Sequence, residues 1–155
     1  MIKVSTRGRY ALRALIDMAL HGDEAPILRQ DIAERQAISA DYVAQLFRKL
    51  HQAGVVEGVK GPGGGYRLAR PPAQITAGDV VRAVEGPVAV VHCALSEEDA
   101  EADEEPACER VDYCVARRLW TRLSDVMTEF LDSVTLEALC EEARDLQSKG
   151  EATDG

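Results

Sequence analysis

A glycine-rich segment, GVKGPGGGYRLAR at residues 58–70, constrains the fold of this chain more than any other feature, because it holds five of the twelve glycines. It does not match a nucleotide-binding loop: no Lys-Ser or Lys-Thr follows the glycines, and Tyr66 stands where a dinucleotide fingerprint has its last glycine. The flanking residues, VVEGV and YRLAR, are typical of strands. We therefore predict a β-hairpin whose tip can approach a ligand closely, although a plain tight turn would give the same pattern.

Three helices are predicted before this hairpin. The first runs from about residue 6 to 21, the second from about 28 to 36, and the third follows Ser39, a good N-cap residue. Gly54 is placed to end the third helix. This order predicts a winged helix-turn-helix, in a chain that is mainly α with a small β-hairpin and a long C-terminal dimerisation helix.

The charge of the chain is unevenly distributed. The net charge is −9, yet residues 1–76 carry 11 Lys and Arg against 7 Asp and Glu, whereas residues 77–155 carry 7 against 20. A basic half joined to an acidic half fits a DNA-binding head on a different kind of body. No apolar stretch is long enough for a membrane span or a signal peptide, so we expect a cytoplasmic protein with reduced cysteines and no membrane partner.

In a winged helix-turn-helix the third helix enters the major groove and the hairpin lies against the backbone or in the minor groove. Glutamine can contact adenine with two hydrogen bonds, and arginine or lysine can neutralise phosphate. Each such residue alone could simply belong to a solvated helix face. Together with the hairpin they favour double-stranded DNA as a partner. The candidate DNA-binding residues are Asp41, Tyr42, Gln45, Arg48, Lys49, Lys60, Gly63 and Gly64.

The second half begins with a capping-box variant, in which Thr76 caps a short helix and Asp79 is the third helical residue. After an acidic loop, a long helix from about residue 116 to 133 carries an apolar face wider than packing on one small head requires. We predict that this face forms a homodimer interface, although a core helix within one monomer is the alternative. The predicted interface residues are Leu119, Leu123, Val126 and Phe130.

Cys93, Cys108 and Cys114 lie between the hairpin domain and the long helix, with the spacing C-x₁₄-C-x₅-C. Zinc ribbons prefer C-x₂-C pairs, and none occurs here. Widely spaced thiolates on loops suit an iron–sulfur cluster, but unrelated free thiols remain an alternative. Cys140, on an amphipathic helix, is expected to be a buried structural residue.

Four stretches, STRGRYALRALIDMAL, ISADYVAQLFRKLHQAGVV, VKGPGGGYRLAR and ITAGDVVRAVEGP, resemble the Rrf2 superfamily of bacterial transcription regulators, in particular its iron–sulfur (IscR) and nitric oxide (NsrR) types. The resemblance covers Met1 to about Leu139. It implies a homodimer with paired long helices and a cluster, 2Fe–2S in preference to 4Fe–4S, held by three cysteines that map onto Cys93, Cys108 and Cys114. It also implies DNA contacts at Tyr42, Gln45 and Lys60.

This sequence departs from the IscR pattern in three places. The interval between Cys93 and Cys108 is long and acidic, Arg117 replaces a histidine, and Ala44 replaces a glutamate on the reading helix. Arginine cannot ligate iron, because its guanidinium has no free lone pair. We expect a weak oxygen or solvent ligand, rather than His92, to complete the cluster.

The expected organisation has four parts. They are a DNA-binding domain at 1–87 (reading helix about 39–53, wing about 55–70), a cysteine-bearing loop at 88–115, a dimerisation helix and terminal helix at 116–146, and a disordered tail at 147–155. The function expected is a transcription regulator, not an enzyme, that senses iron–sulfur status or nitric oxide and redox stress. The alternatives are a cluster-free thiol switch or protein-regulated repressor of the same fold, and a cluster carrier without a specific DNA site.

Overall fold

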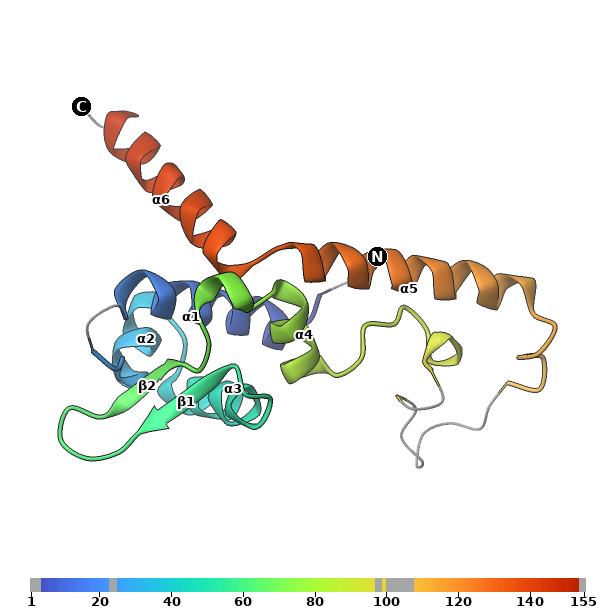
Figure 1. Ribbon diagram of the computed structural model, residues 1–155, viewed down its shortest axis with the longest axis horizontal. Helices are drawn as coiled ribbons and strands as arrows, with labels where there is room; N and C mark the ends of the chain where they lie inside the picture. The colour runs from blue at the N-terminus through green and yellow to red at the C-terminus, as the bar shows by residue number, and fades with distance from the viewer. Residues whose placement is uncertain (1–3, 23–24, 97–98, 100–107, 154–155) are drawn as a thin grey trace.

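The computed structural model describes residues 4–22, 25–96, 99 and 108–153. The elements are α1 (Thr6–His21), α2 (Arg29–Gln36), α3 (Ala40–Gln52), β1 (Val56–Val59), β2 (Gly65–Leu68), a 3₁₀ turn at Pro72–Gln74, α4 (Ala77–Glu85), a second 3₁₀ turn at His92–Ala94, α5 (Val115–Ser133) and α6 (Leu136–Thr153). Helices α1 to α4 and the hairpin form a head, from which α5 extends as an arm (Figure 1). This is the predicted winged helix-turn-helix.

The predicted helix ends are confirmed by their capping contacts. The Ser39 hydroxyl accepts from the amide of Tyr42 at 3.2 Å and so begins α3. Gly54, with φ of +70°, follows the last residues of that helix. Thr76 and Asp79 form the capping box of α4, with bonds of 3.0 and 3.1 Å between side chains and amides.

The hairpin pairs β1 with β2 in antiparallel register from Val56 opposite Leu68 to Val59 opposite Gly65. At the tip, Gly63 has φ of +73°, and a Cβ at Gly64 would collide with the backbone carbonyl of Val59. The turn therefore requires glycine at these positions. The glycine-rich segment forms a compact, backbone-exposing tip.

The core of the head lies between α1, α3, α4 and the base of the hairpin. Its largest fully buried side chains include Leu15, Phe47, Leu50 and Ile75. The rings of Phe47 and Tyr66 pack edge to face with their centroids 4.9 Å apart, so α3 packs against β2. The hairpin is thereby fixed relative to the reading helix.

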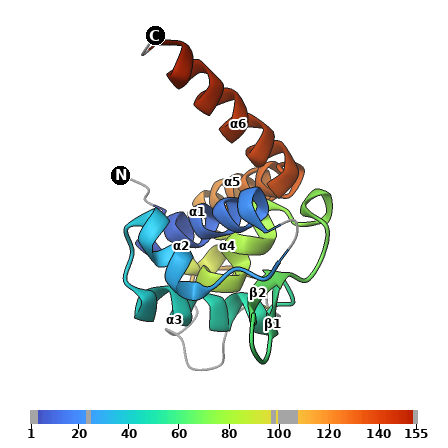
Figure 2. The same cartoon turned by 90° about the vertical axis from the view of Figure 1, so that its left-hand side faces the viewer.

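The junction between α5 and α6 is attached to the head by backbone hydrogen bonds. The amide of Ala77 donates to the Val134 carbonyl at 2.8 Å, and the amide of Leu136 donates to the Ile75 carbonyl at 2.7 Å. Leu136 and Cys140 are buried in the head, as expected for Cys140. Beyond them α6 projects away from the head (Figures 1 and 2).

The C-terminal segment differs from the sequence-based expectation. A disordered tail was expected over 147–155, but α6 continues as a helix to Thr153, and 154–155 lie outside the described residues. The segment ARDLQSK that leads into this region is rich in strong helix formers. A single glycine at position 150 is insufficient to end the helix.

Candidate nucleic-acid interface and cysteine segment

The outer face of α3 presents polar side chains to solvent. The inner face, Val43, Leu46, Phe47 and Leu50, is buried in the head. Asp41, Gln45 and Arg48 are exposed on the opposite side. This face is free to enter a DNA groove.

Lys49 has a different environment from Arg48. It is half-buried, and its ammonium donates to the carbonyl of Val84, near the C-terminus of α4, at 3.1 Å. This bond holds α3 against α4. The predicted contact of Lys49 with DNA remains a prediction.

Tyr42 is half-buried at the start of α3 and rests against Tyr10 of α1, with ring centroids 6.0 Å apart in an edge-to-face arrangement. The guanidinium of Arg13 stacks over the Tyr10 ring, 5.3 Å from the ring centroid. The same guanidinium donates to the carbonyl of Gln36 at 2.8 Å. Helix α1 thus supports the reading helix and the turn before it. Sequence reasoning missed Tyr10 and Arg13, although their spacing of three residues on one helix face was a usable signal.

A buried ion pair fixes α1 to α2. The Asp17 carboxylate is only 3% exposed and accepts three bonds of 2.7 to 3.0 Å from Arg35 and a fourth from Gln36 at 3.0 Å. The hydrogen bond that Arg35 donates to Asp17 is the main cause of the raised pKa of Arg35. An ion pair, as well as apolar packing, therefore fixes the position of α1 relative to α2.

The tip of the wing carries Lys60, which is exposed, beside Gly63 and Gly64. Figure 2 shows α3 and the hairpin along the same lower side of the head. An ion pair between Arg67 and Glu57 joins the two strands below the tip. The two elements predicted to contact DNA, α3 and the hairpin, thus lie on the same side of the head.

The cysteine segment lies beside the arm. Cys93 is in the second 3₁₀ turn, Cys114 is the N-cap of α5, and Cys108 is exposed at a turn in which its carbonyl accepts from the Val111 amide at 2.9 Å. Arg117 Nε donates to the Cys93 carbonyl at 2.6 Å, which ties the Cys93 turn to the first turn of α5. All four cysteines are free thiols.

These three thiols suit iron by their chemistry, since thiolates are the usual ligands of iron–sulfur clusters. Within the described part of the chain, however, no group of three or more His, Cys, Asp or Glu side chains is placed to hold a metal ion. Most of the acidic insert between Cys93 and Cys108 lies outside the described residues. The three thiols therefore suit a cluster by their chemistry, while their convergence on one metal site remains a prediction.

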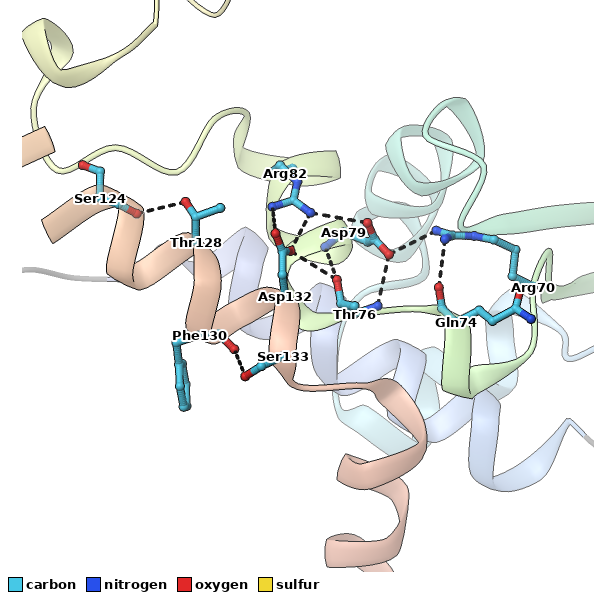
Figure 3. Close-up of polar contacts among 10 residues, drawn as sticks. All are labelled: Arg70, Gln74, Thr76, Asp79, Arg82, Ser124, Thr128, Phe130, Asp132 and Ser133. Atoms are coloured by element: carbon cyan, nitrogen blue, oxygen red, sulfur yellow. Dashed lines mark hydrogen bonds and ion pairs between the residues drawn. The ribbon is translucent and has the colours of Figure 1, made fainter. Parts of the chain in front are cut away.

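A charged network joins α4 to the end of α5 (Figure 3). Arg82 donates to both oxygens of Asp132, at 2.6 and 3.2 Å, and to Asp79 at 3.4 Å. The Asp132 hydrogen bond is the main cause of the raised pKa of Arg82. Burial opposes ionisation of Asp79, but the Thr76 amide, Arg70 and Arg82 together lower the pKa of this carboxyl.

The arm exposes apolar side chains along one stripe. Leu119, Val126 and Phe130 are 58%, 61% and 66% exposed, and Leu123 between them is half-buried. These residues are the predicted dimer interface.

Among the described residues, no helix combines the length and apolar character needed to cross a bilayer.

Comparison with protein families identifies a match over residues 4–142 to the Rrf2 model, described as an iron-dependent transcriptional regulator. Among sequence relatives, the HTH-type transcriptional regulator IscR of Pectobacterium carotovorum subsp. carotovorum is 40% identical over 89% of this chain and 79% of the relative. IscR of Aliivibrio salmonicida is 41% identical over 89% of this chain and 77% of the relative.

Solved structures show the same fold. IscR of T. potens matches with a TM-score of 0.73 and 36% identity, covering 94% of this chain and 90% of that structure. CymR, the global cysteine regulator of B. subtilis, matches with a TM-score of 0.70 and 39% identity over 92% and 98% of the two chains. The oxidised form of Staphylococcus aureus CymR matches with a TM-score of 0.65 and 35% identity over 90% and 96%.

Proposed function

Since the chain belongs to the Rrf2 family of transcriptional regulators, we propose that it is a cytoplasmic homodimer that binds a palindromic DNA site and senses iron–sulfur status, nitric oxide or redox stress through a cluster held by Cys93, Cys108 and Cys114. The relatives are named as transcriptional regulators, a role that is not enzymatic. The family resemblance expected from the sequence is thereby confirmed.

The observation that carries the DNA-binding proposal is the pairing of two exposed elements on one side of the head. Gln45 and Arg48 lie on the free face of α3, and Lys60 lies at the wing tip. In this docking mode Gln45 and Tyr42 contact base edges, whereas Arg48 and Lys60 neutralise phosphates. Gly63 and Gly64 let the wing backbone approach the duplex without side-chain clash.

The dimer proposal rests on the apolar stripe of α5. Exposed apolar patches on an arm that extends from its head mark protein interaction surfaces. A second copy of α5 packed antiparallel on Leu119, Leu123, Val126 and Phe130 would cover these side chains. It would also place two reading helices about one DNA turn, or roughly 34 Å, apart.

For the sensing step, the three cysteine thiolates would hold the cluster, and the cluster, when bound, would supply reactivity toward oxidants and nitric oxide. Cys114 occupies the N-cap position of α5, and Arg117 joins the Cys93 turn to that helix. A change in ligation would therefore act at the N-terminal end of the arm. Its effect on DNA binding would be a shift between two populations of head spacing.

A cluster-free thiol switch is a second candidate. It is favoured by the similarity to the oxidised form of CymR and by the absence of a three-ligand group among the described residues. In this version, reversible oxidation of Cys93, Cys108 or Cys114 would replace cluster ligation as the signal.

Anaerobic purification followed by quantitative DNA binding tests both candidates. A brown protein with iron and inorganic sulfide, whose affinity for DNA changes when the cluster is removed, supports the cluster sensor. A colourless protein whose DNA affinity responds to peroxide and recovers with dithiothreitol supports the thiol switch. Failure to enrich any sequence from a random DNA pool would overturn the regulatory proposal in both versions.

A further inference from the structure

At the C-terminal end of α5, backbone bonds and a side-chain contact both join the arm to the head. The first is the pair of backbone bonds between residues 75–77 and residues 134–136 at the C-terminal end of α5. A helix held at one end can still change direction about that end. The direction of the arm therefore depends on further contacts, which include the bond of 3.2 Å from the Val90 amide to the Ser124 hydroxyl of α5 and the contact described next.

The side-chain contact at this end joins Asp132 to α4. Both oxygens of the Asp132 carboxylate accept from Arg82, and one of them also accepts from the Thr76 hydroxyl at 3.4 Å. A forked contact of this kind fixes orientation as well as distance. Figure 3 shows Asp132 reaching from α5 toward Arg82 and Thr76.

Gly78 makes this contact sterically possible. It lies in the first turn of α4, and a Cβ at this position would collide with the Asp132 carboxylate and crowd the Arg82 guanidinium. Its backbone does not adopt a positive φ. Glycine at position 78 therefore serves to admit Asp132, and not to form a turn.

The same network continues to the wing. Asp79, bonded to Arg82, also accepts from Arg70 at 3.3 Å, and Arg70 follows β2 and donates to the Gln74 carbonyl at 2.9 Å. On the other side of α4, the Val84 carbonyl accepts from Lys49 of the reading helix. Helix α4 thus connects the arm to both DNA-reading elements.

We infer that Asp132 and Arg82 are positioning residues that set the direction of α5 relative to the reading head, and thereby the half-site spacing that the dimer accepts on DNA. This inference rests on the proposed function as a dimeric DNA-binding regulator. An arm of 19 residues is about 28 Å long, so a rotation of about 10° moves its far end by roughly 5 Å. That displacement exceeds the rise of one base pair, about 3.4 Å.

The test measures spacing preference and not affinity alone. A palindromic duplex selected by the wild-type protein from a random pool is remade with one or two base pairs added or removed between its half-sites. A duplex with a single half-site is included. Binding of the wild type and of Asp132→Asn is measured on the whole series.

We expect Asp132→Asn to bind the selected spacing about three- to tenfold more weakly and to discriminate less against altered spacings, since the ion pair is partly exposed and only moderately strong. Binding to the single half-site should be unchanged, because the reading head is intact. Asp125→Asn is the matched control, since it removes the same charge from an exposed position of the same helix. It should retain the wild-type spacing profile.

Gly78→Ala breaks the same contact without removing a charge. Alanine has a higher helix propensity than glycine by about 1 kcal/mol, which offsets part of the cost of displacing Asp132, so this variant should still fold. It should relax spacing discrimination as Asp132→Asn does. Wild-type spacing profiles in both variants would overturn this inference and leave the proposed function intact. A wild type that binds all spacings equally would overturn the dimeric docking model and this inference with it.

Discussion

At the scale of single residues, Gln45 and Lys60 have different tasks in the proposed DNA complex. Gln45→Ala should cost about 1–3 kcal/mol of discrimination at one base position, because a bidentate contact to a base edge is lost. Lys60→Ala should weaken binding to every sequence and reduce the salt slope by about one counterion. Competition binding at several salt concentrations measures both effects, and unchanged affinity and slope in both variants would contradict the docking model.

Asp17 and Arg35 act on the stability of the same head. Arg35→Ala would leave the buried Asp17 carboxylate with the bond of 3.0 Å from Gln36 and the more distant His21 ring, 3.7 Å away. We expect a loss of about 2 kcal/mol in the free energy of unfolding, below the full value of a buried pair because Arg35 is partly exposed. Urea denaturation gives the value. Arg29→Ala, an exposed arginine on the same helix, should change stability by no more than about 0.5 kcal/mol.

At the scale of elements, the stripe on α5 is the feature that a monomer leaves unsatisfied. Leu123→Asp should place an unpaired charge in the proposed interface and yield monomers that do not bind a palindromic site. Light scattering at micromolar concentration measures the mass. Leu28→Asp changes an exposed leucine of the head and should leave the dimer intact. A wild type that is monomeric under these conditions would refute the interface.

The elements also show which parts of the fold local sequence encodes. Helix starts at Ser39 and Thr76 followed from capping residues, because the bonds that form them span only three residues of chain. The hairpin followed from its glycines for the same reason. The contacts of Lys49 with α4 and of Asp132 with Arg82 join residues 35 and 50 positions apart, and no local pattern specifies such pairs.

At the scale of the whole molecule, the placement of the cysteines depends on tertiary structure. The spacing of Cys93, Cys108 and Cys114 indicated a cluster segment, yet it could not specify that Arg117 would bond to the Cys93 carbonyl. That bond places Arg117 in a tethering role beside the thiols, consistent with the expectation that it is not an iron ligand. The domain boundaries and the ligand set remain predictions.

The last prediction tests that ligand set. Cys93→Ala, Cys108→Ala and Cys114→Ala should each lose most of the bound iron after anaerobic purification, because each removes one thiolate of the proposed cluster. Cys140→Ala should retain iron, because Cys140 is buried in the head, where α6 packs near the Ile16 carbonyl of α1.

His92→Ala, next to Cys93 in the same 3₁₀ turn, should also retain iron if a weak oxygen or solvent ligand completes the cluster, as we expect. Iron and sulfide content, with the visible absorbance spectrum, measure the outcome in all five variants. A weakly held fourth position would leave iron accessible to nitric oxide and oxygen, so the wild-type spectrum should bleach on brief exposure to either gas. Colour lost in His92→Ala but retained in Cys108→Ala would replace Cys108 with His92 as the ligand and would move the sensing site onto the 3₁₀ turn that Arg117 ties to the arm.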